Sequence, residues 1–468
     1  AIFGWVCVTI VAALLGLAAP PLSMVTPLAW AIASLASYGA LRSSGALSQS
    51  EALPRGLALG LLASGLLLGG LLGARPALAN GGLPAPGLAA ALLLAVLAMA
   101  GVAPLGMARD EAVLAPAPLG ALIYGLVMPA LGLSYLMRLL AILPSVPPPW
   151  ATTLVSIGAL GALASAAGAY GEARLRPLLG WVSGAQASTV VAAAGLAGPL
   201  AALAGPALLI NLMLATVAGA AAVVDMERNT GSDEFAGAAP GPRLALAGAL
   251  WATAGAAALG IPPLWGFWGR RWLFEAALEQ TPWALPALVV GSALLAPALI
   301  MPLARFWPAP DPRSHPAASG QLDPVAGALS LVPLLVFGVA PQVAWGIWMH
   351  SLPLAPPSLP VSGGAQAAAG AIGLTIMVVA GIMTRTPTAR QIARSSEEEQ
   401  TQLAADALGQ NLQPLARVGR ADGLLSHIWA ALLWASRWLE VIMSAFEQRY
   451  YLLGVLVALI TVMLLMAQ

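Results

Sequence analysis

The chain has 468 residues, of which 59% are hydrophobic and only 8% are charged. Soluble domains carry about a quarter charged residues, so this composition excludes a water-soluble globule and fits a protein dissolved in lipid. The formal net charge of +1 excludes a strongly basic nucleic-acid-binding protein, and the single cysteine, Cys7, excludes an intrachain disulfide or a cysteine-rich metal site.

Apolar stretches long enough to cross a bilayer follow one another along the chain. A spanning helix needs about 20 apolar residues, and this rule predicts about 12–14 transmembrane helices. The predicted spans are residues 4–19, 22–40, 56–74, 87–105, 117–142, 151–170, 179–197, 199–224, 243–262, 264–278, 284–305, 325–349, 366–384 and 449–467. The first span lacks a charged leader and a small-residue cleavage site, so no cleaved signal peptide is predicted. We therefore expect an all-α polytopic membrane protein.

Two stretches share the pattern Gly-x-x-Pro-Leu, at residues 101–105 and 260–264. Each lies where an apolar span should break. Paired interruptions in two halves of a membrane protein are typical of a transporter core built from two inverted repeats with broken helices. The predicted helix breaks are at Pro104, Pro118, Pro262 and Pro263.

The C-terminal part differs in composition from the rest. Residues 385–422 are rich in charged side chains, including three consecutive glutamates at 397–399, and this pattern indicates a solvated connection. Residues 424–447 combine three tryptophans with charges, which is typical of an amphipathic helix lying at the membrane interface, although a further span is the alternative. A last transmembrane helix then follows.

All 20 basic residues of the chain are arginines. A buried lysine can release its proton, whereas an arginine effectively cannot. Any mechanism that needs a titrating lysine is therefore excluded for this chain.

Three segments carry a resemblance to a known family. They read Pro-Leu-Gly-Met-Ala-Arg-Asp-Glu-Ala at 104–112 with Ala-Pro-Ala-Pro-Leu-Gly-Ala-Leu at 115–122, Leu-Arg-Pro-Leu-Leu-Gly-Trp-Val-Ser-Gly-Ala-Gln at 175–186, and Gly-Ile-Pro-Pro-Leu-Trp-Gly-Phe-Trp-Gly-Arg at 260–270. In this order and spacing they resemble signatures of the antiporter-like membrane subunits of respiratory complex I, membrane-bound hydrogenases and multisubunit cation/proton antiporters. The third is the most specific.

The resemblance implies a proton path along the membrane mid-plane, built in that family from buried lysines and one glutamate. Carried over to this chain, the lysine positions fall on Met99, near Met128, and on Arg176, and a lysine-or-glutamate position falls on Arg270. Glu275 is the expected partner of Arg270. The family glutamate has no counterpart upstream of the first signature except Glu51, which lies in an expected loop, and the N-terminal part is about three or four spans shorter than in the family.

Each of these residues also has an interpretation that involves no proton transfer. Arg176 and Arg270 could lie at helix ends and reach the headgroups. The charged run between Asp225 and Glu234 is interpreted as a solvated face. The isolated histidines at 315, 350 and 427 do not indicate a metal site, and no phosphate-binding motif or catalytic triad is present. We expect no cofactor, no metal and no redox centre in this chain.

The resemblance favours an antiporter-like subunit of a complex I-like or hydrogenase-like redox-driven complex, with either an active or a degenerate proton path. The alternatives are a subunit of a cation/proton antiporter and an inert membrane scaffold. Expected partners are other membrane subunits, peripheral redox subunits and the lipid bilayer, in a bacterial or archaeal plasma membrane. The predicted regions are 1–86 (N-terminal helices), 87–310 (antiporter-like core), 311–384 (additional helices), 385–448 (polar linker and interfacial helix) and 449–468 (last helix).

Overall fold

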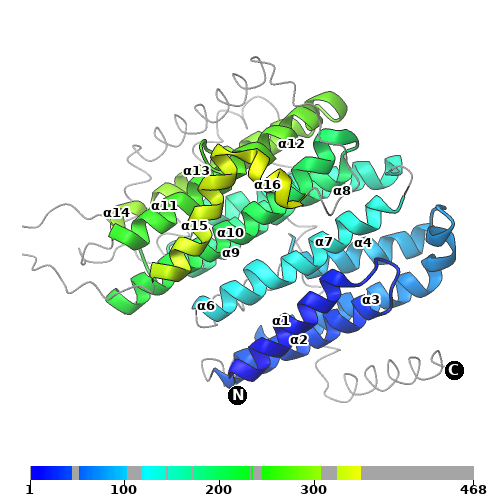
Figure 1. The fold of residues 1–468 in the computed structure, drawn as a ribbon, viewed down its shortest axis with the longest axis horizontal. Helices are drawn as coiled ribbons and strands as arrows, with labels where there is room; N and C mark the ends of the chain where they lie inside the picture. The colour runs from blue at the N-terminus through cyan, green and yellow to red at the C-terminus, as the bar shows by residue number, and fades with distance from the viewer. Residues whose placement is uncertain are drawn as a thin grey trace, which may run out of the picture.

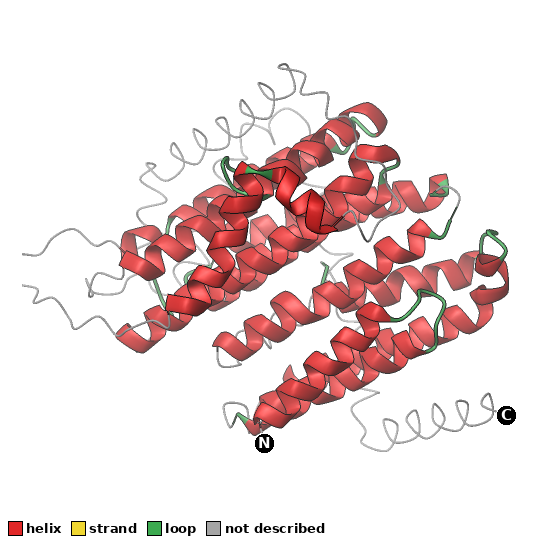
Figure 2. Ribbon diagram, in the orientation of Figure 1, coloured by secondary structure: helices red, strands yellow, loops and turns green. Residues whose placement is uncertain are grey.

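The computed structural model describes residues 2–44, 52–102, 117–143, 146–170, 172–231, 233–235, 245–306 and 324–348. All regular structure in these ranges is helical (Figure 2). The elements are α1 (Ile2–Ala18), α2 (Val25–Ser43), α3 (Ala52–Ala79), α4 (Pro86–Ala100), α6 (Ala117–Gly120), the π-helix η1 (Ala121–Val127), α7 (Met128–Ala141), α8 (Pro148–Tyr170), α9 (Leu175–Gly195), α10 (Gly198–Thr230), α11 (Ala245–Leu259), α12 (Gly266–Gln280), α13 (Leu285–Ile300), α14 (Leu303–Phe306), α15 (Pro324–Val339) and α16 (Pro341–Trp348).

The predicted all-α polytopic membrane fold is confirmed. Within the described ranges, four helical stretches are long and apolar enough to cross a membrane: 56–79, 123–141, 148–169 and 198–228. Five shorter apolar helices accompany them, beginning with α1. The predicted spans at 366–384 and 449–467 and the amphipathic segment at 424–447 lie outside the described residues.

Helix α7 connects two groups of helices. In Figure 1, α1–α4 lie on one side of it and α8–α13 on the other. It packs against α1 and α4 in the first group and against α9 and α10 in the second. The long helix α10 is central to the second group, because α9, α11, α12 and α15 all contact it.

One side chain joins α7 to the end of α1. The guanidinium of Arg138 donates from Nη1 to the carbonyl oxygens of Leu17 (2.5 Å) and Ala19 (2.7 Å), and from Nη2 to that of Gly16 (2.9 Å). The last carbonyls of a helix have no partner within the helix. Nearby, the Tyr135 hydroxyl donates to the carbonyl oxygen of Pro21 at 3.0 Å. Both contacts hold the α1–α2 turn against α7.

The two Gly-x-x-Pro-Leu stretches begin with the same backbone turn. Gly101 and Gly260 have φ angles of +64° and +73°, in the left-handed region that favours glycine. At each site the glycine N–H and the next N–H bond back to carbonyls of the helix that is ending, from Gly101 and Val102 after α4 and from Gly260 and Ile261 after α11. This is the Schellman arrangement. Two repeats of one unit would produce such matched ends, and the inverted-repeat relation itself stays a prediction.

Helix α11 and helix α12 form a broken helix along α10. They follow one another along its length (Figure 1). Pro262 and Pro263, joined by a cis peptide bond, lie in the non-helical turn between them. The first half has a different irregularity that the sequence did not predict, the π-helical turn η1 immediately before α7. Such wider turns are frequent at functional sites.

We expect Arg138→Ala to loosen the joint between α1 and α7. The change removes the side-chain partner of two terminal carbonyls of α1, which should lower the free energy of unfolding by roughly 2 kcal/mol. The measurement is the apparent unfolding temperature of the purified protein in a mild detergent. The matched control is Arg75→Ala on α3, because Arg75 is exposed. Equal unfolding temperatures for the two variants would contradict the assignment.

Candidate functional site

A set of buried polar side chains crosses the second helix group, from α9 through α10 to α13. We name it the polar line and define it as Ser183, Gln186, Asn211, Thr216, Arg270 and Ser292, all of which are buried. The Ser183 and Thr216 hydroxyls are 3.1 Å apart. The Asn211 side-chain amide donates to Oε1 of Gln186 at 2.9 Å. Neighbouring turns of two packed helices therefore hold two polar pairs inside an apolar core.

The polar line begins next to the π-helical turn. Gly125 of η1 lies directly against Thr216, because a Cβ built on Gly125 would stand 2.4 Å from Cγ2 of Thr216. The absence of a side chain at this position lets η1 approach α10. The wider helical turn of the first half is thus in contact with the first polar pair.

The line reaches the break between α11 and α12 through a backbone carbonyl. The Asn211 amide also donates to the carbonyl oxygen of Ala257 at 3.0 Å, in the last turn of α11. Gly266, the first residue of α12, is packed so tightly here that a Cβ would stand 1.9 Å from that oxygen and 2.8 Å from Oδ1 of Asn211. Oδ1 of Asn211 is buried without a hydrogen-bond partner.

A small cavity adjoins this point. It measures about 10 Å³, and Gln186 lines it together with side chains of α9, α10, α11 and Leu299 of α13. That volume is near the minimum for one water molecule, which would need polar partners of the kind that Gln186 provides. Gln186 is the one polar side chain that lines it, and the other lining side chains are apolar or small.

Arg270 is the ionisable member of the polar line. Its side chain is 5% exposed, and its Nη1 donates to the Ser292 hydroxyl, which in turn donates to the Leu288 carbonyl oxygen at 2.9 Å. The aliphatic part of Arg270 covers Gly260, whose missing Cβ would stand 2.5 Å from Cδ of the arginine. Among the described residues no carboxylate is paired with Arg270. It is a buried cation held by a neutral hydroxyl.

The expected pairing of Arg270 with Glu275 was wrong. Glu275 accepts from Nε of Arg271 at 3.1 Å, and the Arg271 guanidinium lies 5.6 Å from the ring centroid of Trp268. The reason is helix geometry, because residues four apart face each other while residues five apart do not. Arg270 and Glu275 therefore lie on different faces of α12.

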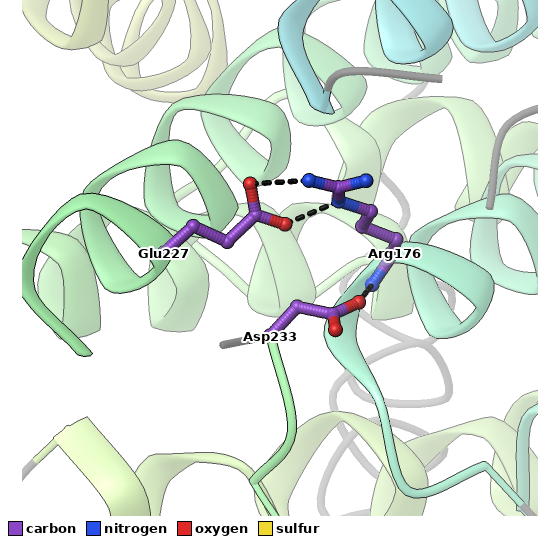
Figure 3. Close-up of polar contacts among 3 residues, drawn as sticks. All are labelled: Arg176, Glu227 and Asp233. Carbon is purple, nitrogen blue, oxygen red and sulfur yellow. Dashed lines mark hydrogen bonds and ion pairs between the residues drawn. The ribbon is translucent and has the colours of Figure 1, made fainter. Parts of the chain in front are cut away.

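Arg176 lies at a helix end and is paired with carboxylates (Figure 3). It occupies the first turn of α9, where its guanidinium binds both oxygens of Glu227 near the end of α10, with Nη2 to Oε2 at 2.7 Å. Its backbone N–H donates to Oδ2 of Asp233 at 3.3 Å. The side chains of Arg176 and Glu227 are 25% and 19% exposed. The two-pronged contact with Glu227 joins α9 to α10. The backbone bond to Asp233 joins α9 to the segment after α10.

The two methionines at family lysine positions are packed as core residues. Met99 in α4 is 4% exposed and Met128, the first residue of α7, is 7% exposed. Both belong to the larger apolar cluster of the protein. Pro118 lies inside the short helix α6, whereas Glu51 and Pro104 lie outside the described residues.

Several residues of the site escaped the sequence analysis. Asp225 was interpreted as part of a solvated charged run, but it is 5% exposed within α10, and Glu227 is engaged with Arg176. Asn211 and Ser292 carry no sequence motif. The available signal was a polar residue in the middle of an apolar span, which in a membrane protein indicates a buried partner.

Comparison with known proteins relates the chain to one family of membrane subunits. Residues 80–296 match the family described as NADH:quinone oxidoreductase/Mrp antiporter, transmembrane region. The matched residues include α9, α10, α11, α12 and residues 285–296 of α13, and the match confirms the resemblance seen in the sequence. A comparison with curated proteins found no match.

Three solved structures show the same fold. A chain of respiratory complex I from Thermus thermophilus is 23% identical with a TM-score of 0.58, covering 74% of this chain and 79% of that one. A chain of the Mrp complex from Dietzia sp. DQ12-45-1b is 19% identical with a TM-score of 0.61, covering 80% and 79%. A chain of the membrane-bound sulfane sulfur reductase, an archaeal respiratory membrane complex, is 18% identical with a TM-score of 0.58, covering 76% and 73%.

We expect Arg176 and Glu227 to show measurable coupling in a double-mutant cycle. The pair is two-pronged but partly exposed, so the coupling free energy should be about 1 kcal/mol, toward the upper end for surface pairs. Unfolding of Arg176→Ala, Glu227→Ala and the double variant in detergent provides the measurement. Replacing the exposed Arg228 by alanine in the same cycle is the control, and a coupling as small as that of Arg228 would rule out a structural role for the pair.

Proposed function

We propose that this chain is an antiporter-like membrane subunit of a redox-driven, ion-translocating complex of the complex I or hydrogenase type, and that its own proton path is degenerate. The core matched at residues 80–296 supports the first part of the proposal. Two of the three similar structures come from respiratory membrane complexes. In this proposal residues 87–310 form the antiporter-like core, and the membrane is a bacterial or archaeal plasma membrane.

The single observation that carries the degenerate path is the state of Arg270. It is the ionisable member of the polar line, buried beside a broken helix, with a serine hydroxyl as its partner. A guanidinium keeps its proton under all ordinary conditions, so it donates hydrogen bonds and repels cations but does not pass protons on. The other members of the line are neutral amides and hydroxyls, which can order water.

The first half of the core supports the same conclusion. Met99 and Met128 are apolar and packed in the core, where the family resemblance places lysines. A proton entering between α4 and α7 finds no titratable group at these two positions. In this proposal the chain is therefore a structural part of the membrane portion of the complex. Arg270 supplies a fixed positive charge within it.

A cation/proton antiporter subunit is the second candidate, and the likeness to a chain of the Mrp complex favours it. An exchanger that binds cations needs acidic side chains within the membrane. Asp225 is the buried carboxylate in the described part of the chain, and no group of three or more metal-binding side chains occurs there. We therefore place this candidate second.

The first test is purification of the chain from its native membrane in a gentle detergent, followed by mass spectrometry of the proteins that accompany it. We expect iron–sulfur, flavin or hydrogenase-type subunits, because the proposal requires an electron-transfer module to drive ion movement. Recovery with small membrane subunits alone would reject the redox-driven complex and favour the antiporter.

The second test addresses Arg270 in the assembled complex. We expect Arg270→Met to leave the number of protons translocated per electron unchanged, because a fixed charge takes no part in proton exchange. The measurement is acidification of inverted membrane vesicles during turnover, with assembly verified by native electrophoresis. Arg75→Met, an exposed arginine of α3, is the control for loss of charge. A lower proton yield in Arg270→Met with full assembly would contradict the proposal that Arg270 takes no part in translocation.

A further inference from the structure

A groove on the N-terminal helices has no role in the proposed function. It lies between α1 and α2 and has a volume of about 760 Å³, within the range of sites that hold small organic molecules. The two helices are antiparallel and joined by a short turn, so the start of α1 lies beside the end of α2 (Figure 1).

The groove is apolar over most of its length. Val8 of α1 and Ile32 and Leu35 of α2 line this part, and each is more than a third exposed. Trp5 forms a wall nearer the start of α1, where its ring lies on Gly39, because a Cβ on Gly39 would stand 2.7 Å from the indole. The missing side chain at Gly39 thus seats Trp5 at the side of the groove.

One end of the groove is polar and positively charged. Arg42, Tyr38 and Ser43 line it close to the end of α2. Nη1 of Arg42 donates to the Tyr38 hydroxyl at 2.9 Å, so that oxygen is an acceptor and the Tyr38 proton remains available to a further acceptor. No carboxylate is paired with Arg42 in the described ranges. Arg42 is exposed.

This distribution matches a membrane amphiphile. A tryptophan, a tyrosine and an arginine at one end of two apolar helices are typical of the headgroup level of the bilayer. An arginine fork with a neighbouring hydroxyl donor matches the oxygens of a phosphodiester. The groove is lined by the large side chains of Trp5, Ile32 and Leu35, and also by the small residues Ala36, Gly39 and Ser43 of α2. The positive charge at its polar end favours an anionic lipid as the occupant.

We propose that the α1–α2 groove is a binding site for an anionic phospholipid. One acyl chain lies along Val8, Ile32 and Leu35, and the phosphate accepts hydrogen bonds from Arg42 and Tyr38. The site does not depend on whether the polar line carries protons.

The test is native mass spectrometry of the purified protein after exchange into micelles that contain phosphatidylglycerol or phosphatidylcholine. We expect Arg42→Gln to weaken retention of phosphatidylglycerol by about fivefold, the effect of one basic residue at an anionic surface. Arg75→Gln, which removes an exposed arginine outside the groove, should change nothing. Leu35→Trp, which fills the apolar part without changing charge, should reduce retention of both lipids. Equal retention of phosphatidylglycerol by all four proteins overturns the proposal.

A photo-reactive amino acid at position 32 tests the occupant in the native membrane. An adduct of phospholipid mass on this chain supports the lipid site, and its yield should fall in the Arg42→Gln background. A cross-link to a protein subunit in place of lipid would show that the groove is a protein interface.

Discussion

The structure depends on one constraint, which is that lipid offers no hydrogen bonds, so that each backbone group within the membrane needs a partner inside the protein. Regular helices satisfy most of these groups. The backbone groups that lack a partner lie mainly where helices end. At Gly101 and Gly260 the chain turns back on itself and bonds its own carbonyls. At the end of α1 the chain supplies the guanidinium of Arg138 from another helix. Buried indole N–H groups also find partners on the backbone, since Trp251, Trp265 and Trp268 each donate to a backbone carbonyl oxygen.

The polar line follows from the same constraint. A broken helix leaves carbonyls exposed within the core, and Asn211 reaches one of them at Ala257 while it binds Gln186 on the other side. Oδ1 of Asn211 itself has no hydrogen-bond partner within the protein. The one ionisable member of the polar line is Arg270, whose guanidinium carries a permanent positive charge.

Length and composition were sufficient to predict the helices, because a chain this apolar has few other ways to satisfy its backbone. The positions of the breaks were also predictable where glycine and proline mark them, as at 260–263. The π-helical turn at 121–127 was not, since no residue there is barred from an ordinary α-helix. Cross-helix pairs such as Arg176–Glu227 depend on how α9 and α10 are placed, which no local pattern records. The error over Glu275 was avoidable, because helical spacing alone assigns it to Arg271.

The contact of Arg138 with α1 has a consequence for biogenesis. The arginine follows Gly16, whose carbonyl it binds, by 122 residues. Ribosomes add about 5–20 residues per second, so the end of α1 waits roughly 6–24 seconds for its partner. The contact between Arg138 and the end of α1 can therefore form only after α7 has been made.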